Sequence, residues 1–202
     1  MTGKAEFCAR TNVSRETLAM LETHAELLKS WNPHINLVSA GTMETLWTRH
    51  FLDSAQLLRL APPARRWVDL GSGGGFPGAV VAIMAKDKTE TVLIEADGRK
   101  AAFLRTLSRE TAGFTVITAR LENAEPQCGD VVSARALAPL GTLLGHVRRH
   151  LKPDGRAILP KGKKVQREIR QALEHWRFDC ETYPSETDEE AVILSIGGIR
   201  RA

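Results

Sequence analysis

The stretch WVDLGSGGGFPG, residues 67–78, decides the fold of this chain. A short apolar run breaks there into glycines at positions 71, 73, 74 and 75, and Pro77 stands where a helix can begin. A strand, a glycine-rich turn and a helix start, in this order, are typical of a nucleotide-binding crossover. Glycine adopts positive φ and lets a ligand approach the backbone without meeting a Cβ atom. A purely structural turn is the alternative.

Length and composition favour one α/β domain with a helical appendage. The chain has 202 residues, of which 43% are hydrophobic and 26% charged, as is usual for a globular protein. Its formal net charge of +4 and pI of about 9.1 suit a nucleic-acid partner without requiring one. No apolar run approaches the length of a membrane span.

The start of the chain, MTGKAEFCARTN, has no apolar core of the kind that a signal peptide needs. Cys8, Cys128 and Cys180 are too scattered for a disulfide framework or a zinc site. We therefore expect a cytoplasmic protein that binds neither a membrane nor a metal. We also expect a monomer.

Two helices are predicted before the glycine-rich stretch. Apolar residues recur at helical spacing over residues 14–31, and Pro33 is expected to end this helix. A second helix is predicted over residues 43–60. Residues 1–63 would form a helical cap, and residues 64–202 the main domain, as one compact unit. His50 and Asp53 share a face of the second helix, where a hydrogen bond between helices and a role in holding RNA are both open.

Glu95 is the first candidate site residue beyond the glycine-rich stretch. It ends a strand predicted over residues 91–95, about 20 residues beyond the glycines. In Rossmann-like folds an acid at this place accepts hydrogen bonds from the two hydroxyls of a ribose. The alternative is an exposed acid at the end of a strand.

Further candidates follow the third and fourth strands, which are predicted over residues 114–118 and 130–133. Leu121 and Glu122 stand where an adenine would lie, although Leu121 could equally be core and Glu122 a helix cap. Arg135 is difficult to place beside a buried strand unless an anionic group receives it. That group could be a ligand, or a structural salt bridge to Asp69 or Glu95.

The remaining elements complete the predicted fold. Helices are expected over residues 77–85, 101–110, 139–151 and 161–176, with a strand over residues 155–159. The last two strands, over residues 178–183 and 191–196, are joined by an acidic stretch without the apolar content of a crossover helix. They must therefore pair antiparallel. The fold class is α/β: a Rossmann-like, mostly parallel sheet with a C-terminal antiparallel hairpin and an N-terminal helical cap.

These features resemble the class I S-adenosylmethionine-dependent methyltransferases. With WNPHINL (31–37), RHFLDS (49–54), SARALAPL (133–140) and LPKG (159–162), the chain closely resembles the RsmG (GidB) family of small-subunit ribosomal RNA methyltransferases. The resemblance implies methylation of guanine N7 in the 530 loop of 16S rRNA, free or in the small ribosomal subunit, with S-adenosylmethionine as donor. The cofactor contacts that it implies are Gly71, Phe76, Leu121, Glu122 and Arg135.

The residue pattern adds Gly73 and Glu95 to these contacts, although the family usually has Asp where this chain has Glu95. Guanine N7 offers a lone pair and has no proton to remove, so we predict no catalytic acid or base. Asp69 could orient the cofactor's ammonium group or stabilise the charge that moves onto the ring. A basic run is expected to grip RNA phosphates, or to be only a solvated helix face. It consists of Lys161, Lys163, Lys164, Arg167 and Arg170. Further basic residues could join it in gripping the phosphates: Arg148, Arg149, Lys152, Arg200 and Arg201.

Other functions remain open. Gly73, Gly75 and Gly78 satisfy G-x-G-x-x-G and could indicate an NAD-linked oxidoreductase, but Asp69 would crowd a pyrophosphate. A methyltransferase that acts on another RNA, a small molecule or a protein is the second alternative. The third is a non-catalytic ribosome-assembly factor on the same fold.

Overall fold

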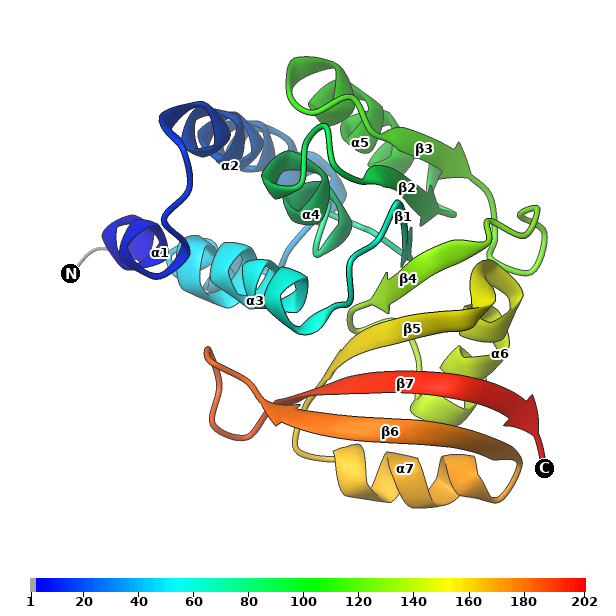
Figure 1. Cartoon of the computed structure of the whole chain (residues 1–202). Helices are drawn as coiled ribbons and strands as arrows, with labels where there is room; N and C mark the ends of the chain where they lie inside the picture. The colour runs from blue at the N-terminus through cyan, green and yellow to red at the C-terminus, as the bar shows by residue number, and fades with distance from the viewer. Residues whose placement is uncertain (1–2) are drawn as a thin grey trace.

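A seven-stranded sheet with the order β3-β2-β1-β4-β5-β7-β6 forms the centre of the computed structural model, which describes residues 3–202 (Figure 1). Strands β1 to β5 are parallel, and β7 runs antiparallel to both β5 and β6. This arrangement confirms the predicted Rossmann-like sheet and its C-terminal hairpin. The strands are β1 (Arg66–Leu70), β2 (Glu90–Glu95), β3 (Thr115–Thr118), β4 (Gly129–Ala134), β5 (Leu151–Lys161), β6 (Trp176–Pro184) and β7 (Val192–Arg201).

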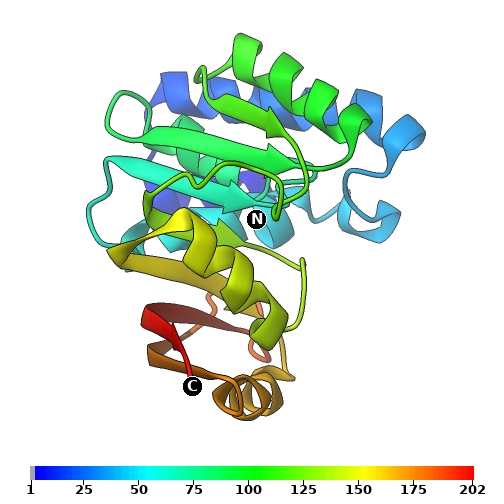
Figure 2. The ribbon, with the colours of Figure 1, turned by 90° about the vertical axis from the view of Figure 1, so that its right-hand side faces the viewer.

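Helices cover both faces of the sheet (Figure 2). The N-terminal part consists of α1 (Gly3–Thr11), α2 (Arg15–Ile35), the 3-10 turn η1 (Ala40–Thr42), the π-helix η2 (Trp47–Leu52) and α3 (Asp53–Leu60). The other helices are α4 (Gly78–Met84), α5 (Gly98–Glu110), α6 (Leu140–His150) and α7 (Val165–Leu173). One core joins α1, α2, η2, α4 and α5, and a second core lies between the sheet, α6 and α7.

The alternation of strand residues explains the two larger cores. Val68 and Leu70 of β1 belong to the core under α6, whereas Leu93 of β2 faces α4, α5 and the N-terminal helices. Phe7 and Phe51 bring the N-terminal helices into the same core as Leu93. The N-terminal helices therefore form a layer over α4 and α5. The proposed division at residue 63 stays a prediction, and its residues 1 and 2 lie outside the described part.

Two local predictions were wrong, and one helix was missed. Pro33 does not end α2, which continues to Ile35, because few helical residues follow it and only one N–H donor is lost near the end. Helix α1 was not predicted; it is held by Phe7, whose ring centroid lies 5.3 Å from that of Trp47. The second predicted helix is divided into a π-helix and α3.

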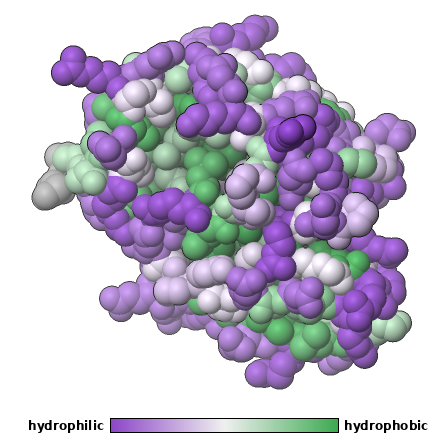
Figure 3. Space-filling view, in the orientation of Figure 1, coloured by the Kyte–Doolittle hydropathy of each residue, from purple (hydrophilic) through white to green (hydrophobic). Residues whose placement is uncertain are grey.

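The surface is mostly hydrophilic, and hydrophobic side chains gather in the middle of the face shown in Figure 3, around the junction of the N-terminal helices and the sheet. Among residues 3–202, no helix is long and apolar enough to cross a membrane. The same residues contain no group of three or more His, Cys, Asp or Glu side chains placed to hold a metal ion.

Candidate active site

The glycine loop after β1 leaves its backbone open at the carboxyl edge of the sheet. Gly71, Gly73 and Gly75 have φ values of 68°, 52° and 90°, which side chains rarely adopt. The N–H of Gly71 donates to Ile94 O of β2 over 2.8 Å, so the loop turns beside the end of that strand. A Cβ built on Gly73 would have Gly71 O as its nearest neighbour, at 4.0 Å. A ligand can therefore approach the backbone closely here.

Glu95 stands directly beside this loop and is nearly buried, with 8% of its surface exposed. Its Oε2 accepts the N–H of Gly73 over 2.8 Å, and its Oε1 accepts the N–H of Asp97 over 2.9 Å. The carboxylate thus fixes the glycine loop. Each oxygen keeps a lone pair that could accept a hydroxyl of a ribose.

Leu121 and Glu122 follow β3 at the same edge, because Thr118 pairs with Glu95 in the sheet. Leu121 is half-buried against the core under α6, and its carbonyl lies 3.1 Å from His150 Nε2. Glu122 is exposed and caps no helix, since residues 119–128 contain none. The helix-cap alternative for Glu122 is therefore wrong. The two residues form an edge beside the glycine loop that could hold a flat base.

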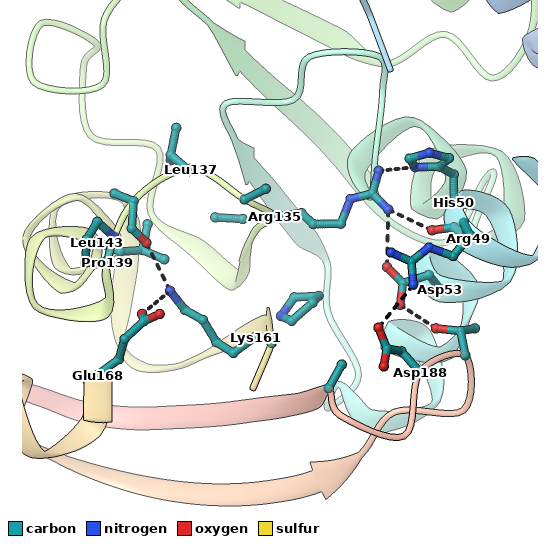
Figure 4. Close-up of a pocket in the computed structure, with 17 residues that line it drawn as sticks. Arg49, His50, Asp53, Arg135, Leu137, Pro139, Leu143, Lys161, Glu168 and Asp188 are labelled. Carbon is teal, nitrogen blue, oxygen red and sulfur yellow. Dashed lines mark hydrogen bonds and ion pairs between the residues drawn. The ribbon is translucent and has the colours of Figure 1, made fainter. Parts of the chain in front are cut away.

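Arg135 contacts the N-terminal helices and not Asp69 or Glu95 (Figure 4). Its Nη1 donates to Asp53 Oδ2 and to the carbonyl of Arg49, both over 3.2 Å, and its Nη2 lies 2.6 Å from His50 Nδ1. The guanidinium also lies 5.1 Å from the ring centroid of Phe76. The expected alternative of a salt bridge to Asp69 or Glu95 is wrong, because the RHFLDS segment folds over the end of β4 and brings Asp53 closer.

Two histidines of the N-terminal helices contact the glycine loop. Burial, and then the positive charges of Arg135 and Arg49, lower the pKa of His50 to about 3. His50 is therefore neutral, so its Nδ1 accepts from Arg135 and its Nε2–H faces Thr42 Oγ1 at 2.8 Å. His24 stacks on the ring of Phe76 with centroids 4.9 Å apart, and its Nε2 lies 2.8 Å from the carbonyl of Gly74.

Asp69 lies beneath the loop and is fully buried. Its Oδ1 accepts the hydroxyl of Ser133 over 2.6 Å, and that hydroxyl accepts Trp67 Nε1–H over 2.8 Å. Burial raises the pKa of Asp69 to about 6. A Cβ on Gly78 would lie 2.6 Å from Asp69 Cβ, so Gly78 is required for the close packing of α4 on β1. Asp69 supports the loop from behind.

A cleft of about 590 Å³ opens beside Arg135, between η2, the ends of β4 and β5, and the tip of the β6–β7 hairpin (Figure 4). Apolar side chains form one wall: Leu137, Pro139, Leu143 and Pro160. Arg49 and Asp188 face each other across the opposite wall, with Nη1 and Oδ2 3.1 Å apart. Leu137 also covers Gly71, because a Cβ there would lie 2.6 Å from Leu137 Cδ1. The cleft therefore adjoins the glycine loop.

The predicted basic run is divided by the structure. Lys161 lies in the wall of the cleft, where Nζ donates to Ala138 O over 3.0 Å and to Glu168 Oε2 over 2.9 Å. The other four residues lie on the exposed surface of α7 and the turn before it: Lys163, Lys164, Arg167 and Arg170.

All the predicted cofactor residues meet at one edge of the sheet: Gly71, Gly73, Phe76, Glu95, Leu121, Glu122 and Arg135. A carboxylate, open backbone and apolar side chains together suit a nucleoside with a ribose diol. Sequence reasoning missed His24, Leu137 and Glu168 as neighbours of the site. The quoted motifs contain only Leu137 of these three, and none of them stands out by residue type.

Comparison with known proteins gives a family match over most of the chain. The family described as rRNA small subunit methyltransferase G (GidB) matches residues 17–190. The ribosomal RNA small subunit methyltransferase G of Ruegeria sp. (strain TM1040) is 49% identical over 194 residues, which are 94% of this chain and 95% of that protein. The protein of the same name from Paracoccus denitrificans (strain Pd 1222) is 48% identical, over 95% of this chain and 100% of its own length.

Solved structures with much lower identity share the fold. A TehB-like SAM-dependent methyltransferase from Corynebacterium glutamicum aligns with a TM-score of 0.58 and 14% identity, over 87% of this chain and 98% of that one. Aeropyrum pernix fibrillarin, solved with natively bound S-adenosyl-L-methionine, aligns with a TM-score of 0.55 and 13% identity, over 72% and 76% of the two chains.

Proposed function

This chain belongs to the rRNA small subunit methyltransferase G family, and we propose on that basis that it methylates N7 of a guanine in the 530 loop of 16S rRNA. It is an S-adenosylmethionine-dependent methyltransferase of small-subunit rRNA. The observation that carries the proposal is the family match over residues 17–190, which contain the glycine loop and all but one of the residues that line the cleft. We also propose that the protein acts in the cytoplasm, as a monomer.

The donor is proposed to lie at the carboxyl edge of the sheet. Gly71 turns the chain at the end of β1, Gly73 allows the close approach of the nucleoside, and the free lone pairs of Glu95 accept the ribose hydroxyls. Leu121 packs on the adenine, while Glu122 and the adjacent backbone receive its polar edge. Glu95 is engaged with the loop, so the ribose contact and the shape of the loop depend on one carboxylate.

Phe76 and Arg135 are proposed to close the donor site on the side of the cleft. Their mutual contact of 5.1 Å places a fixed positive charge at the end of β4. Asp53 and His50 hold that charge in position from the N-terminal helices. The guanidinium keeps donors for an anionic group of the donor, such as its carboxylate.

The chemistry needs positioning more than proton transfer. S-adenosylmethionine supplies a methyl group bound to a sulfonium. When the S–CH3 bond breaks, its electron pair stays on sulfur, and the neutral thioether is a good leaving group. The N7 lone pair forms the new bond and no proton is released, so the chain needs neither a general base nor a metal for this step. The cleft residues must hold N7 in line with the methyl group and exclude water. In favourable cases such positioning lowers a barrier by roughly 7 to 11 kcal/mol.

The target base must be unpaired or turned out of its helix. N7 lies on the major-groove edge, which A-form RNA buries in a deep and narrow groove. The apolar wall of the cleft, with Leu137 and Pro139, suits a purine face, and Lys161 adds a donor within the cleft. The phosphates around the target are proposed to lie on the exposed basic residues beside it: Lys163, Lys164, Arg167 and Arg170.

Methylation mapping in cells tests this function. Small-subunit rRNA from cells with and without the gene would be mapped for N7-methylguanine at single-nucleotide resolution. We expect one methylated guanine in the 530 loop to disappear without the gene and to return with it. An identical map in both cell types would contradict the proposal. The same assay in vitro, on free rRNA and on assembled particles, identifies the form of the substrate.

A further inference from the structure

Five exposed arginines gather at the edge of the sheet opposite the cleft. We call them the arginine cluster: Arg148, Arg149, Arg177, Arg200 and Arg201. The first two lie in the last turn of α6, Arg177 lies at the start of β6, and the last two end β7. Their elements meet there, since one hollow of about 420 Å³ is lined by Arg148, Arg149, Trp176 and Arg201.

The pairing of β6 with β7 concentrates positive charge. Arg177 stands directly opposite Arg200, and Arg201 is the next residue, opposite Trp176. Like charges directly opposite each other destabilise a strand pair. Within residues 3–202, none of the five arginines forms an ion pair with a carboxylate. The fold therefore carries an electrostatic cost at this edge that an anionic partner would remove.

Three exposed arginines of the N-terminal helices are neutralised, in contrast to the cluster. In the N-terminal helices, Arg10 and Arg59 both pair with Glu186 of the hairpin tip, and Arg49 pairs with Asp188. Positive charges near a helix C-terminus interact favourably with the helix dipole, which gives a structural reason for Arg148 and Arg149 of α6. It gives no reason for the three that lie on strands.

The guanidinium groups of three members of the cluster are held in place. That of Arg201 lies 4.0 Å from the ring centroid of Trp176. Arg149 donates to Ala124 O through Nε and Nη2, over 3.1 and 2.9 Å. Arg177 donates to the carbonyls of Leu173 and Trp176, over 2.7 and 3.0 Å. Fixed guanidinium groups lose little freedom on binding, and their remaining N–H groups match phosphate oxygens.

We propose that the arginine cluster binds RNA phosphates outside the target loop, as a second contact with the small-subunit rRNA. This inference rests on the proposed function. Helix α6 runs from Leu140, beside the cleft, to the cluster, and its eleven residues span about 16 Å. Because the two sites lie at opposite edges, a short loop that fills the cleft does not reach the cluster. The cluster contacts a more distant segment of a large, folded RNA.

The test uses a double variant, Arg148→Gln with Arg200→Gln. Neither side chain forms a hydrogen bond within residues 3–202, so the fold should persist, and thermal unfolding of the variant checks this. The matched control is Arg15→Gln with Lys88→Gln, which removes two exposed, unpaired charges elsewhere. Binding to full-length small-subunit rRNA and to a short 530-loop RNA would be measured from low to moderate salt.

For full-length rRNA, we expect the double variant to bind at least about tenfold more weakly at low salt and to show a salt slope shallower by about 1.4 to 1.8. Its binding and methylation of the short RNA should match wild type, as should the control variant on both RNAs. Equal affinities of the double variant and wild type for full-length rRNA would overturn the inference. So would an equal loss on the short RNA. The proposed function is tested separately, by the methylation that wild type carries out. If wild type methylates no guanine in either RNA, the proposed function is contradicted, whatever the binding data show for the cluster.

Discussion

The Nη2 atom of Arg135 lies 2.6 Å from Nδ1 of His50, and the two residues are 85 positions apart in the chain. This contact joins the end of β4 to the π-helix of the N-terminal part. Both side chains also lie close to Phe76 of the glycine loop, His50 with ring centroids 4.9 Å apart and Arg135 at 5.1 Å. The donor side of the site is thus built jointly by the N-terminal helices and the sheet.

The first prediction concerns this contact. Arg135→Ala should abolish donor binding, and His50→Ala should weaken it by about tenfold, because the guanidinium loses one of its fixed partners. Each change should also lower the free energy of unfolding by about 1 to 3 kcal/mol, since a charged hydrogen bond is lost. Calorimetry with the donor and urea unfolding measure both effects.

The double variant provides the control for that prediction. If the contact acts as described, the effects of His50→Ala and Arg135→Ala are not additive, because the second change removes a bond that is already broken. Strictly additive losses in the free energy of unfolding would show that the two side chains act independently.

The second prediction concerns the glycine loop. Gly71→Ala should lower the free energy of unfolding by roughly 1 to 2 kcal/mol, because alanine is strained at its φ of 68°. The new methyl group would also push aside Leu137, whose Cδ1 lies 2.6 Å from it, and so disturb the junction between the loop and the cleft. Donor affinity should fall by at least tenfold. The matched control is Gly98→Ala at the start of α5, where a Cβ would meet nothing within 4 Å among the described residues. Equal donor affinities of both variants would contradict the role of this loop.

The sequence predicted the sheet better than the helix boundaries. Residues 67–78 determine a strand, a loop and a helix through local chemistry alone, and the acidic stretch before β7 requires a hairpin. The end of α2 depends on a side-chain contact with the residues that follow the helix. Asn32 Oδ1 accepts the N–H groups of Leu37 and Val38 over 2.8 and 2.9 Å, which stabilises the chain just beyond Pro33. Helical spacing does not reveal such a contact.

The site shows the same division. Glu95 could be placed because strand order and the glycine loop bring it there. The partner of Arg135 could not, because Asp53 lies 82 residues away on a helix whose packing is tertiary. Lys161 was grouped with the basic run by its neighbours in sequence, but the end of β5 turns it into the cleft.

The third prediction concerns RNA phosphates beside the cleft. Lys163→Gln with Lys164→Gln should weaken binding of the short 530-loop RNA and reduce the salt slope by about 1.4 to 1.8. Lys163 has only a distant, exposed partner, Glu190 at 3.8 Å, so little internal structure is lost. Donor affinity should not change. Retention of the wild-type salt slope would remove these lysines from the RNA contact.

The fourth prediction is a pH dependence of stability. Burial lowers the pKa of His24 to about 4, below the value of 6.5 for an exposed histidine. Its contribution to stability is therefore fully present above pH 6.5 and is lost as the pH falls through about 4. That loss amounts to about 3 kcal/mol.

His24→Leu isolates this contribution. At pH 7 the variant should be less stable by about 1 kcal/mol, since the bond to Gly74 O is lost. Between pH 6.5 and 4 its free energy of unfolding should fall less steeply than that of wild type. His50 and Asp69 also have shifted pKa values, and their protonation changes the stability in opposite directions. Both residues are present in wild type and in the variant, so the difference between the two curves reports on His24. Parallel curves would contradict the assignment.

A reaction with 7-deazaguanosine tests the central claim most directly. Two small-subunit RNA substrates would differ only at the target guanine of the 530 loop, where the second carries carbon in place of N7. Purified protein and labelled S-adenosylmethionine would be added to each. We predict one methyl group per molecule on the normal RNA and none on the 7-deaza RNA, with both RNAs bound equally. Methylation of the 7-deaza RNA, or of neither RNA, would contradict the account.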